Sequence, residues 1–219
     1  MHVVVNAATS ADGKLSSRRR EQIAISGEED FARVDRLRAE VNAVAVGVGT
    51  VLADDPSLVR HDEAHRADSH GPDAAPPARV VVDSRCRTPD DADVLDGEPE
   101  TYVLTSESAP DERRRELERS GATLLAAGDE RVDLPAALTA LAGEGVESLL
   151  VEGGGELIFS LFEAGLVDEL SVFVGGMVIG GREAPTLADG EGFVADFSAL
   201  ELAGVERLDD GVLLRWTVA

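Results

Sequence analysis

Short apolar runs alternate with helix-period patterns along most of the chain. Each run is rich in β-branched or aliphatic residues and ends at turn residues, which predicts a strand in each; the runs are 3–8, 43–48, 79–82, 101–105, 122–125, 148–151 and 169–174. Apolar positions at helical spacing predict helices over 111–120, 134–141 and 154–164. This alternation predicts a single α/β domain over 1–219, with a mostly parallel central sheet and helices on both faces.

The two ends of the chain have signals of their own. The sequence Ser26-Gly27-Glu28-Glu29 is typical of a capping box that opens a helix. The buried stripe of that helix is expected to hold Phe31, Val34, Leu37 and Val41. The turn Asp209-Asp210-Gly211 separates two apolar runs and predicts a C-terminal antiparallel hairpin. Segment 61–78 is polar and lacks periodicity, so we expect a loop there.

The chain is strongly acidic, with 43 acidic and 20 basic residues among 219 and a formal net charge of −23. A field of that sign repels phosphate, which argues against nucleic acid or an anionic membrane as a partner. A phosphorylated small molecule would need a local cluster of Arg side chains or backbone N–H groups. Lys14 is the only lysine. That composition is typical of a salt-adapted, halophilic protein, or of a GC-rich genome that favours Arg codons.

The cysteine and histidine residues give no sign of a metal centre. The single cysteine, Cys86, excludes an internal disulfide and a Cys-rich zinc site. It lies between two arginines that could lower its pKa, although a bystander thiol is the simpler interpretation. His61, His65 and His70 have irregular spacing, which favours solvated side chains over metal ligands. The sequence has no targeting signal and no membrane-spanning run, so we expect a cytoplasmic protein.

Two strand ends are candidate ligand sites. The run Gly153-Gly154-Gly155 does not fit the dinucleotide fingerprint G-x-G-x-x-G, yet it leads from a strand into a helix whose first amides can bind a pyrophosphate. A tight strand-to-helix turn would need glycine as well. Thr50 and Asp54 follow another strand, at the edge where open α/β sheets bind ligands. The alternative there is an acidic turn closed by Pro56.

Five blocks of sequence, in this order, resemble the riboflavin-pathway pyrimidine reductases, which have a dihydrofolate-reductase-like fold. The blocks are NAATSADGKL at 6–15, RAE at 38–40 with GVGTVLADDPSL at 47–58, VDSR at 82–85, LVEGGG at 150–155 and AGLVDE at 164–169. Bacterial relatives fuse this domain to a zinc deaminase that needs an H-x-E and a P-C-x-x-C pattern. With one cysteine, the chain resembles the stand-alone archaeal type.

The resemblance implies a reaction and a set of site residues. Such enzymes use NADPH to reduce the ribosylamino side chain of a diaminopyrimidinone 5′-phosphate to a ribitylamino chain, and they are homodimers that need no metal. Carried over by position, the cofactor contacts are Thr50, Asp54, Ser84, Gly153, Gly154 and Gly155. The substrate contacts are Arg38, Leu58, Arg60 and Glu152. Asn6 stands where bacterial relatives often have a lysine.

Some roles stay open at this point. The charges of Arg85 and Arg87 suit either residue to hold the 2′-phosphate of the cofactor. The proton handler is unknown, with Glu152, Asp54 and Lys14 as candidates.

Two other functions compete with this one. A dihydrofolate-reductase-type pterin reductase would need a buried acid on the first helix, which offers Glu28, Glu29, Asp30, Asp35 and Glu40 without a clear inward candidate. A non-catalytic nucleotide-binding module would explain the glycine turns but not the polar residues that suit a second, phosphorylated ligand. NADPH oxidation with each candidate substrate would discriminate among the three.

Overall fold

The computed structural model describes residues 1–21 and 23–219. The chain divides into two compact units: unit 1 comprises Asp35–Leu150 with Met1, and unit 2 comprises His2–Val34 with Val151–Ala219. Helix α1 (Glu28–Glu40) and strand β6 (Ser148–Gly153) each contribute residues to both units. The predicted fold class is confirmed: the chain is mixed α/β, with mostly parallel strand pairs and a C-terminal antiparallel hairpin. The assignment of all 219 residues to a single domain stays a prediction.

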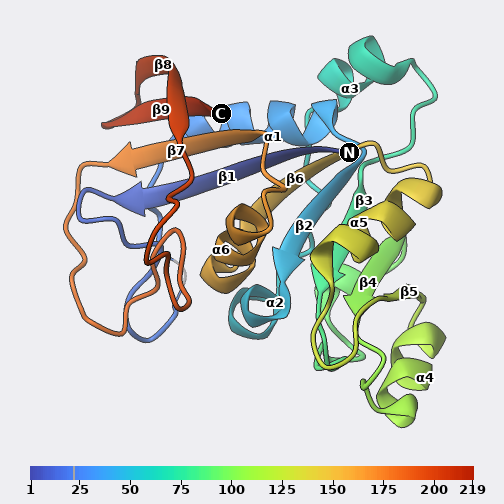
Figure 1. Ribbon diagram of the computed structural model, residues 1–219. Coiled ribbons are helices and arrows are strands. Elements are labelled where there is room, and N and C mark those ends of the chain that lie inside the picture. Colours follow the sequence, from blue (N-terminus) through green and yellow to red (C-terminus); the bar gives the residue numbers. More distant parts are fainter. Residues whose placement is uncertain (22) are drawn as a thin grey trace. The chain divides into compact units, whose positions relative to one another are not determined.

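Unit 1 is built on four parallel strands. They are β2 (Ala43–Gly47), β3 (Ala78–Val82), β4 (Thr101–Thr105) and β5 (Ala122–Ala126), in the order β5-β4-β3-β2. The helices of this unit are α2 (Val48–Asp54), α3 (Glu63–His70), α4 (Asp111–Arg119) and α5 (Leu134–Gly143), with a 3-10 turn η1 at Asp93–Leu95. Figure 1 shows α4 and α5 beside β4 and β5. Their apolar residues, such as Leu117 and Leu141, are fully buried.

Helix α3 contradicts the loop predicted over 61–78. Asp62 caps its first turn by accepting a hydrogen bond from the His65 amide. The helix is anchored by Arg66, a buried guanidinium that donates to the carbonyl oxygens of Ala39, Val41 and Ala75. Because a charged side chain rather than an apolar stripe attaches this helix, hydrophobic periodicity could not reveal it.

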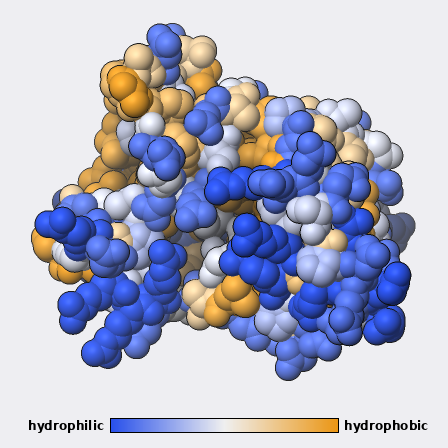
Figure 2. Space-filling model, turned by 60° about the horizontal axis from the view of Figure 1, so that its bottom comes forward, coloured by the Kyte–Doolittle hydropathy of each residue, from blue (hydrophilic) through white to orange (hydrophobic). Residues whose placement is uncertain are grey.

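Unit 2 combines parallel and antiparallel pairing. Strand β1 (His2–Ser10) pairs in parallel with β7 (Glu169–Gly175), and β9 (Gly211–Val218) lies antiparallel between β7 and β8 (Leu200–Leu208). The predicted hairpin is therefore confirmed. Helix α6 (Gly155–Glu163) buries Leu157, Ile158 and Leu161. Hydrophilic residues cover most of the face of the molecule in Figure 2, in keeping with the composition.

Helix α1 begins differently from the predicted capping box. The carboxylate of Asp209, in the turn of the β8–β9 hairpin, accepts hydrogen bonds from the amides of Gly27, Glu29 and Asp30. In return, the amide of Asp209 donates to the Glu29 carboxylate. Phe31 was expected in the buried stripe, but it is 46% exposed. The helix is capped by a residue about 180 positions away, which no local sequence pattern contains.

The long-range cap predicts a loss of stability in Asp209→Asn. The variant keeps the left-handed backbone that Asp209 adopts (φ 46°), but half of its side chain becomes a donor that faces N–H donors. We expect the free energy of unfolding to fall by about 1–2 kcal/mol, measured by urea denaturation. Asp210→Asn, one position further along the exposed turn, is the matched control. Equal stability of both variants would contradict the cap.

Candidate functional site

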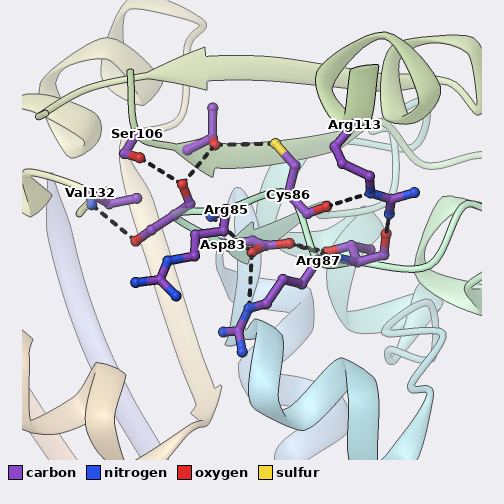
Figure 3. Close-up of polar contacts among 10 residues, drawn as sticks. Asp83, Arg85, Cys86, Arg87, Ser106, Arg113 and Val132 are labelled. Atoms are coloured by element: carbon purple, nitrogen blue, oxygen red, sulfur yellow. Dashed lines mark hydrogen bonds and ion pairs between the residues drawn. The ribbon is translucent and has the colours of Figure 1, made fainter. Parts of the chain in front are cut away.

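The loop after strand β3 is organised by a buried carboxylate. Asp83 is fully buried, and its Oδ2 accepts hydrogen bonds from the amide and the hydroxyl of Thr88 at 2.7 and 2.8 Å. Its Oδ1 accepts from the Arg85 amide at 3.3 Å. On the other side of the loop, Arg113 donates to the carbonyl oxygens of Cys86 and Thr88. Figure 3 shows these contacts enclosing the loop, which fixes the backbone of 83–88.

Rigid backbone in this loop directs two arginines to one side. Figure 3 shows the guanidinium groups of Arg85 and Arg87 extending away from the Cys86 sulfur. Both residues are exposed, and Arg87 Nε lies 3.9 Å from the Asp83 carboxylate. Two exposed cations on a fixed loop at a strand end suit an anionic ligand group.

Cys86 does not have the lowered pKa that its arginine neighbours suggested. The residue is fully buried, and burial raises the pKa of its thiol. Its Sγ lies 3.2 Å from the Thr105 hydroxyl. The bystander interpretation fits this environment, because the arginines that flank Cys86 in the sequence extend to the other side of the loop.

Ser84 and the residues of α2 complete the strand-end positions of unit 1. The Ser84 hydroxyl accepts a hydrogen bond from the Val132 amide at 3.1 Å, which leaves its own proton available to a ligand. Thr50 and Asp54 lie on α2, a helix that the sequence did not predict, and one turn of helix separates them. Asp54 is exposed as a residue, yet partial burial of its carboxyl group raises its pKa.

Three predicted substrate residues lie in or beside the segment that follows α2. Leu58 is buried with a positive φ of 54°. Arg60 forms an ion pair with Asp35 (Nε to Oδ2, 2.8 Å), and Arg38 Nη1 donates to the Arg60 carbonyl oxygen at 3.0 Å. The structure therefore brings Arg38 and Arg60 together, and the ion pair with Asp35 holds the Arg60 guanidinium in place.

In unit 2, two of the three consecutive glycines are required by the backbone itself. Gly154, the N-cap of α6, has φ 94° and ψ 91°, a region that side chains rarely permit. A Cβ on Gly155 would lie 2.6 Å from the Thr186 carbonyl oxygen and 2.8 Å from the Asp189 carboxylate. The tight-turn interpretation thus accounts for these two positions. The N-cap still carries no side chain, so the first amides of α6 suit a phosphate.

The remaining proton-handling candidates belong to unit 2. Lys14 is partly buried, and its Nζ donates to the Ala184 carbonyl oxygen at 3.1 Å. Glu152 is half-buried near the end of β6. Nearby in the sequence, hydrogen bonds from the Ser10 hydroxyl and the Ile179 amide lower the pKa of Asp12 to about 2. Asp12 therefore stays a carboxylate and is unsuited to donating a proton.

One polar cluster escaped the sequence analysis. Asp30 on α1 is 2% exposed and pairs with Arg33, which also contacts Asn6 and Ser171. The first helix therefore does hold an inward-facing acid. The spacing of Asp30 and Arg33, three residues apart, was the available signal. Because Arg33 pairs with it, this acid is not a free carboxylate.

The described part of the chain holds neither a membrane-crossing helix nor a metal-binding cluster of side chains. In residues 1–21 and 23–219, no helix has both the length and the apolar character needed to cross a bilayer. The same residues contain no group of three or more His, Cys, Asp or Glu side chains that could hold a metal ion. His65 instead contacts the Glu40 carboxylate, and His70 the Glu40 carbonyl oxygen.

Comparison with known proteins identifies the family. The RibD C-terminal domain matches residues 1–214. This chain belongs to that family. A relative from Archaeoglobus fulgidus, named 2,5-diamino-6-ribosylamino-4(3H)-pyrimidinone 5′-phosphate reductase, is 46% identical over 214 residues, which are 96% of this chain and 94% of the relative. A relative of the same name from Methanothermobacter thermautotrophicus is 46% identical over 219 residues, covering 99% and 98%.

Solved structures agree with this assignment to the RibD C-terminal domain family. A structure of RibD from Acinetobacter baumannii has a TM-score of 0.79 and 26% identity. The match covers 100% of this chain and 58% of the RibD chain, so this chain spans little more than half of that protein. The predicted family is confirmed, whereas the roles of individual RibD-type site residues stay predictions.

The burial of Cys86 predicts a thiol that is unreactive in the native state. A raised pKa means that the thiolate fraction at any pH is smaller than for a free cysteine, and the sulfur is also shielded from solvent. At pH 8 we expect a disulfide reagent to label the native protein at least a hundredfold more slowly than the protein in guanidinium chloride. Rapid labelling of the native protein would contradict this environment.

Proposed function

We propose that this protein is an NADPH-dependent oxidoreductase of riboflavin biosynthesis. Its substrate is 2,5-diamino-6-ribosylamino-4(3H)-pyrimidinone 5′-phosphate, and it reduces the ribosylamino side chain to the ribitylamino form. The observation that carries the proposal is the 46% identity, over at least 96% of this chain, to two relatives named as that reductase. The match covers nearly the whole length of both relatives, so the activity in their name belongs to the part that this chain matches.

The residues at the strand ends suit a dinucleotide phosphate. In unit 1, Thr50, Asp54 and Ser84 offer polar groups, and the fixed loop extends Arg85 and Arg87 into solvent, where either can bind a 2′-phosphate. In unit 2, Gly153, Gly154 and Gly155 present the amides of α6 without a capping side chain. When bound, the nicotinamide supplies the hydride that the reduction needs.

The protein's own contribution is to bind, orient and protonate. Arg38, Leu58 and Arg60 of unit 1, with Glu152 of unit 2, are assigned to the substrate. Proton transfer falls to Glu152, Asp54 or Lys14. The raised pKa of Asp54 supports a proton-donor role, since a larger fraction of its carboxyl group is protonated at a given pH than in an ordinary aspartate.

The competing functions receive less support. A pterin reductase would need a free inward acid on α1, and Asp30 is instead paired with Arg33. A non-catalytic nucleotide-binding module would not need Arg38 and Arg60 to lie close together in space. We further assign the protein to the cytoplasm of a salt-adapted cell, without nucleic acid, membrane or metal; the net charge of −23 supports the exclusion of polyanionic partners.

Two arginine variants test the reaction and the assigned roles together. Arg38→Ala should raise KM for the ribosylamino phosphate about tenfold or more and leave NADPH affinity within about twofold, because a charge-assisted phosphate contact is worth on the order of 1.5–3 kcal/mol.

Arg85→Ala should instead affect the cofactor. It should lower the preference for NADPH over NADH about tenfold and leave KM for the ribosylamino phosphate nearly unchanged. The measurement is NADPH and NADH oxidation with purified substrate.

Each variant is the control for the other, and a thermal unfolding curve is to be recorded for both to check that they are folded. An unreactive wild-type protein would overturn the proposed reaction. If Arg38→Ala leaves KM unchanged, Arg38 is structural and the phosphate binds elsewhere. If Arg85→Ala keeps its cofactor preference, Arg87→Ala is the next variant to measure.

We further propose that the protein forms a homodimer through the C-terminal hairpin. The apolar run 170–174, considered as a pairing surface from the sequence, is excluded because β7 is buried between β1 and β9. On β8, a register shift between Leu202 and Gly204 brings Leu200, Leu202 and Val205 onto one face. Leu202 and Val205 are about 60% exposed. Figure 2 shows hydrophobic residues on the side of the hairpin.

This apolar face fits a second copy of the chain, because it borders an unpaired edge strand. Sedimentation should show a dimer that strengthens between low and molar salt, since salt screens the repulsion between two chains of −23. Leu202→Glu should weaken the dimer at least tenfold. Glu201→Gln, on the opposite face of β8, is the control and should dimerise as the wild type does. A monomer at both salt concentrations would refute the assembly.

A further inference from the structure

A network of polar side chains lies between α1 and the strands of unit 2. Arg33 Nε donates to Asp30 Oδ1 at 2.8 Å, Nη1 to the Ser171 hydroxyl at 3.2 Å, and Nη2 to Asn6 Oδ1 at 2.9 Å. Asn6 and Ser171 are direct partners in the register of β1 and β7, so both side chains lie on the face that α1 covers. Every member except Arg33 is more than nine-tenths buried.

This network fixes which way the Asn6 amide points. A guanidinium has five donors and no acceptor, so the atom of Asn6 that faces Arg33 must be the carbonyl oxygen. The amide nitrogen therefore points away from Arg33. Asp30 neutralises the guanidinium, which allows the cation to stay in this partly buried place.

The amide nitrogen of Asn6 is left without a partner inside the protein. Nothing in residues 1–21 and 23–219 accepts a hydrogen bond from it. Over the same residues, the only buried side-chain nitrogen or oxygen without a partner is Arg114 Nε. The Asn6 nitrogen must then reach solvent, although the residue as a whole is only 6% exposed. A donor that is fixed in place and largely shielded from water is suited to recognising a ligand by hydrogen bonding.

We propose that the Asn6 amide nitrogen donates a hydrogen bond to an oxygen of the bound substrate, and that Arg33 is the positioning residue that orients this amide. The inference rests on the proposed function, because it takes the ribosylamino pyrimidinone phosphate as the ligand. That molecule carries carbonyl and hydroxyl oxygens that only a donor can satisfy. The oxygen of Asn6 is held by Arg33, so the amide cannot rotate to accept instead.

Asn6→Asp tests the donor with little change in shape. The variant replaces the NH2 group by an acceptor oxygen, and its charge is placed against Arg33, so we expect the fold to persist. Titration calorimetry with the substrate, without cofactor, should show at least a tenfold loss of affinity, and KM should rise by a similar factor. NADPH affinity, measured by fluorescence titration, should stay within about twofold. Asn42→Asp is the matched control.

Asn42 is the only other asparagine of the chain, and its Oδ1 likewise accepts hydrogen bonds, from Ser148 and the Glu147 amide. The same added charge there should leave substrate affinity unchanged. Arg33→Met tests the positioning role: substrate affinity should fall, and should fall no further when Asn6→Asp is added. Additive losses would show that Arg33 acts independently of the amide.

The possible results distinguish a failure of the Asn6 contact from a failure of the proposed reaction. Full substrate affinity in folded Asn6→Asp would overturn the assigned donor while leaving the reaction intact. Loss of NADPH affinity instead of substrate affinity would also overturn it, because the amide would then serve the cofactor. If the wild-type protein neither binds nor reduces the substrate, the proposed function fails and this inference fails with it.

Discussion

Buried main-chain carbonyl groups at the ends of elements need donors, and in unit 1 arginine side chains supply them. Arg66 and Arg79 are buried and donate to three carbonyl oxygens each, while Arg113 and Arg114 donate to two each. Burial lowers the pKa of Arg66 and Arg79, but from so high a value that both stay charged. A guanidinium that spans several carbonyls fixes whole loops. The candidate ligand groups of unit 1 depend on that rigidity.

The loop at 83–88 shows how this constraint leads to chemistry. Asp83 holds the loop from within and Arg113 holds it from the flank. These contacts occupy the interior of the loop, and the guanidinium groups of Arg85 and Arg87 extend to its outside. In unit 2 a carboxylate plays the part that arginines play in unit 1. The Asp209 carboxylate accepts hydrogen bonds from the first amides of α1, as the guanidinium groups of unit 1 donate to carbonyl oxygens. In both units, paired charges and hydrogen bonds fix the backbone inside, and in unit 1 exposed arginine side chains remain at the surface to meet a ligand.

Whether an element could be predicted from the sequence depended on the kind of interaction that holds it in place. Strand β2 is fully buried and apolar, and β4 is fully buried and rich in β-branched residues, so their runs could be recognised. Helix α3 was missed because Arg66 anchors it, and the true cap of α1 was missed because Asp209 is distant in sequence. Arg38 and Arg60 do lie close together, since Arg38 Nη1 donates to the Arg60 carbonyl oxygen, but their common role at a strand end stays a prediction. The network around Arg33 needed the register of β1 and β7, which no local pattern contains.

The same distinction explains why the glycine run and the asparagine carry different weight. At Gly154 and Gly155 the fold itself demands glycine, through backbone conformation and the approach of Thr186, so their presence does not by itself argue for a ligand. At Asn6 the fold demands only an acceptor for Arg33, and a purely accepting side chain of the same length would meet that demand. The donor half of the amide exceeds what folding requires. A polar group that the structure orients but that the fold does not need is the stronger sign of function, because a donor fixed at the edge of a buried network can meet a ligand without reorganisation.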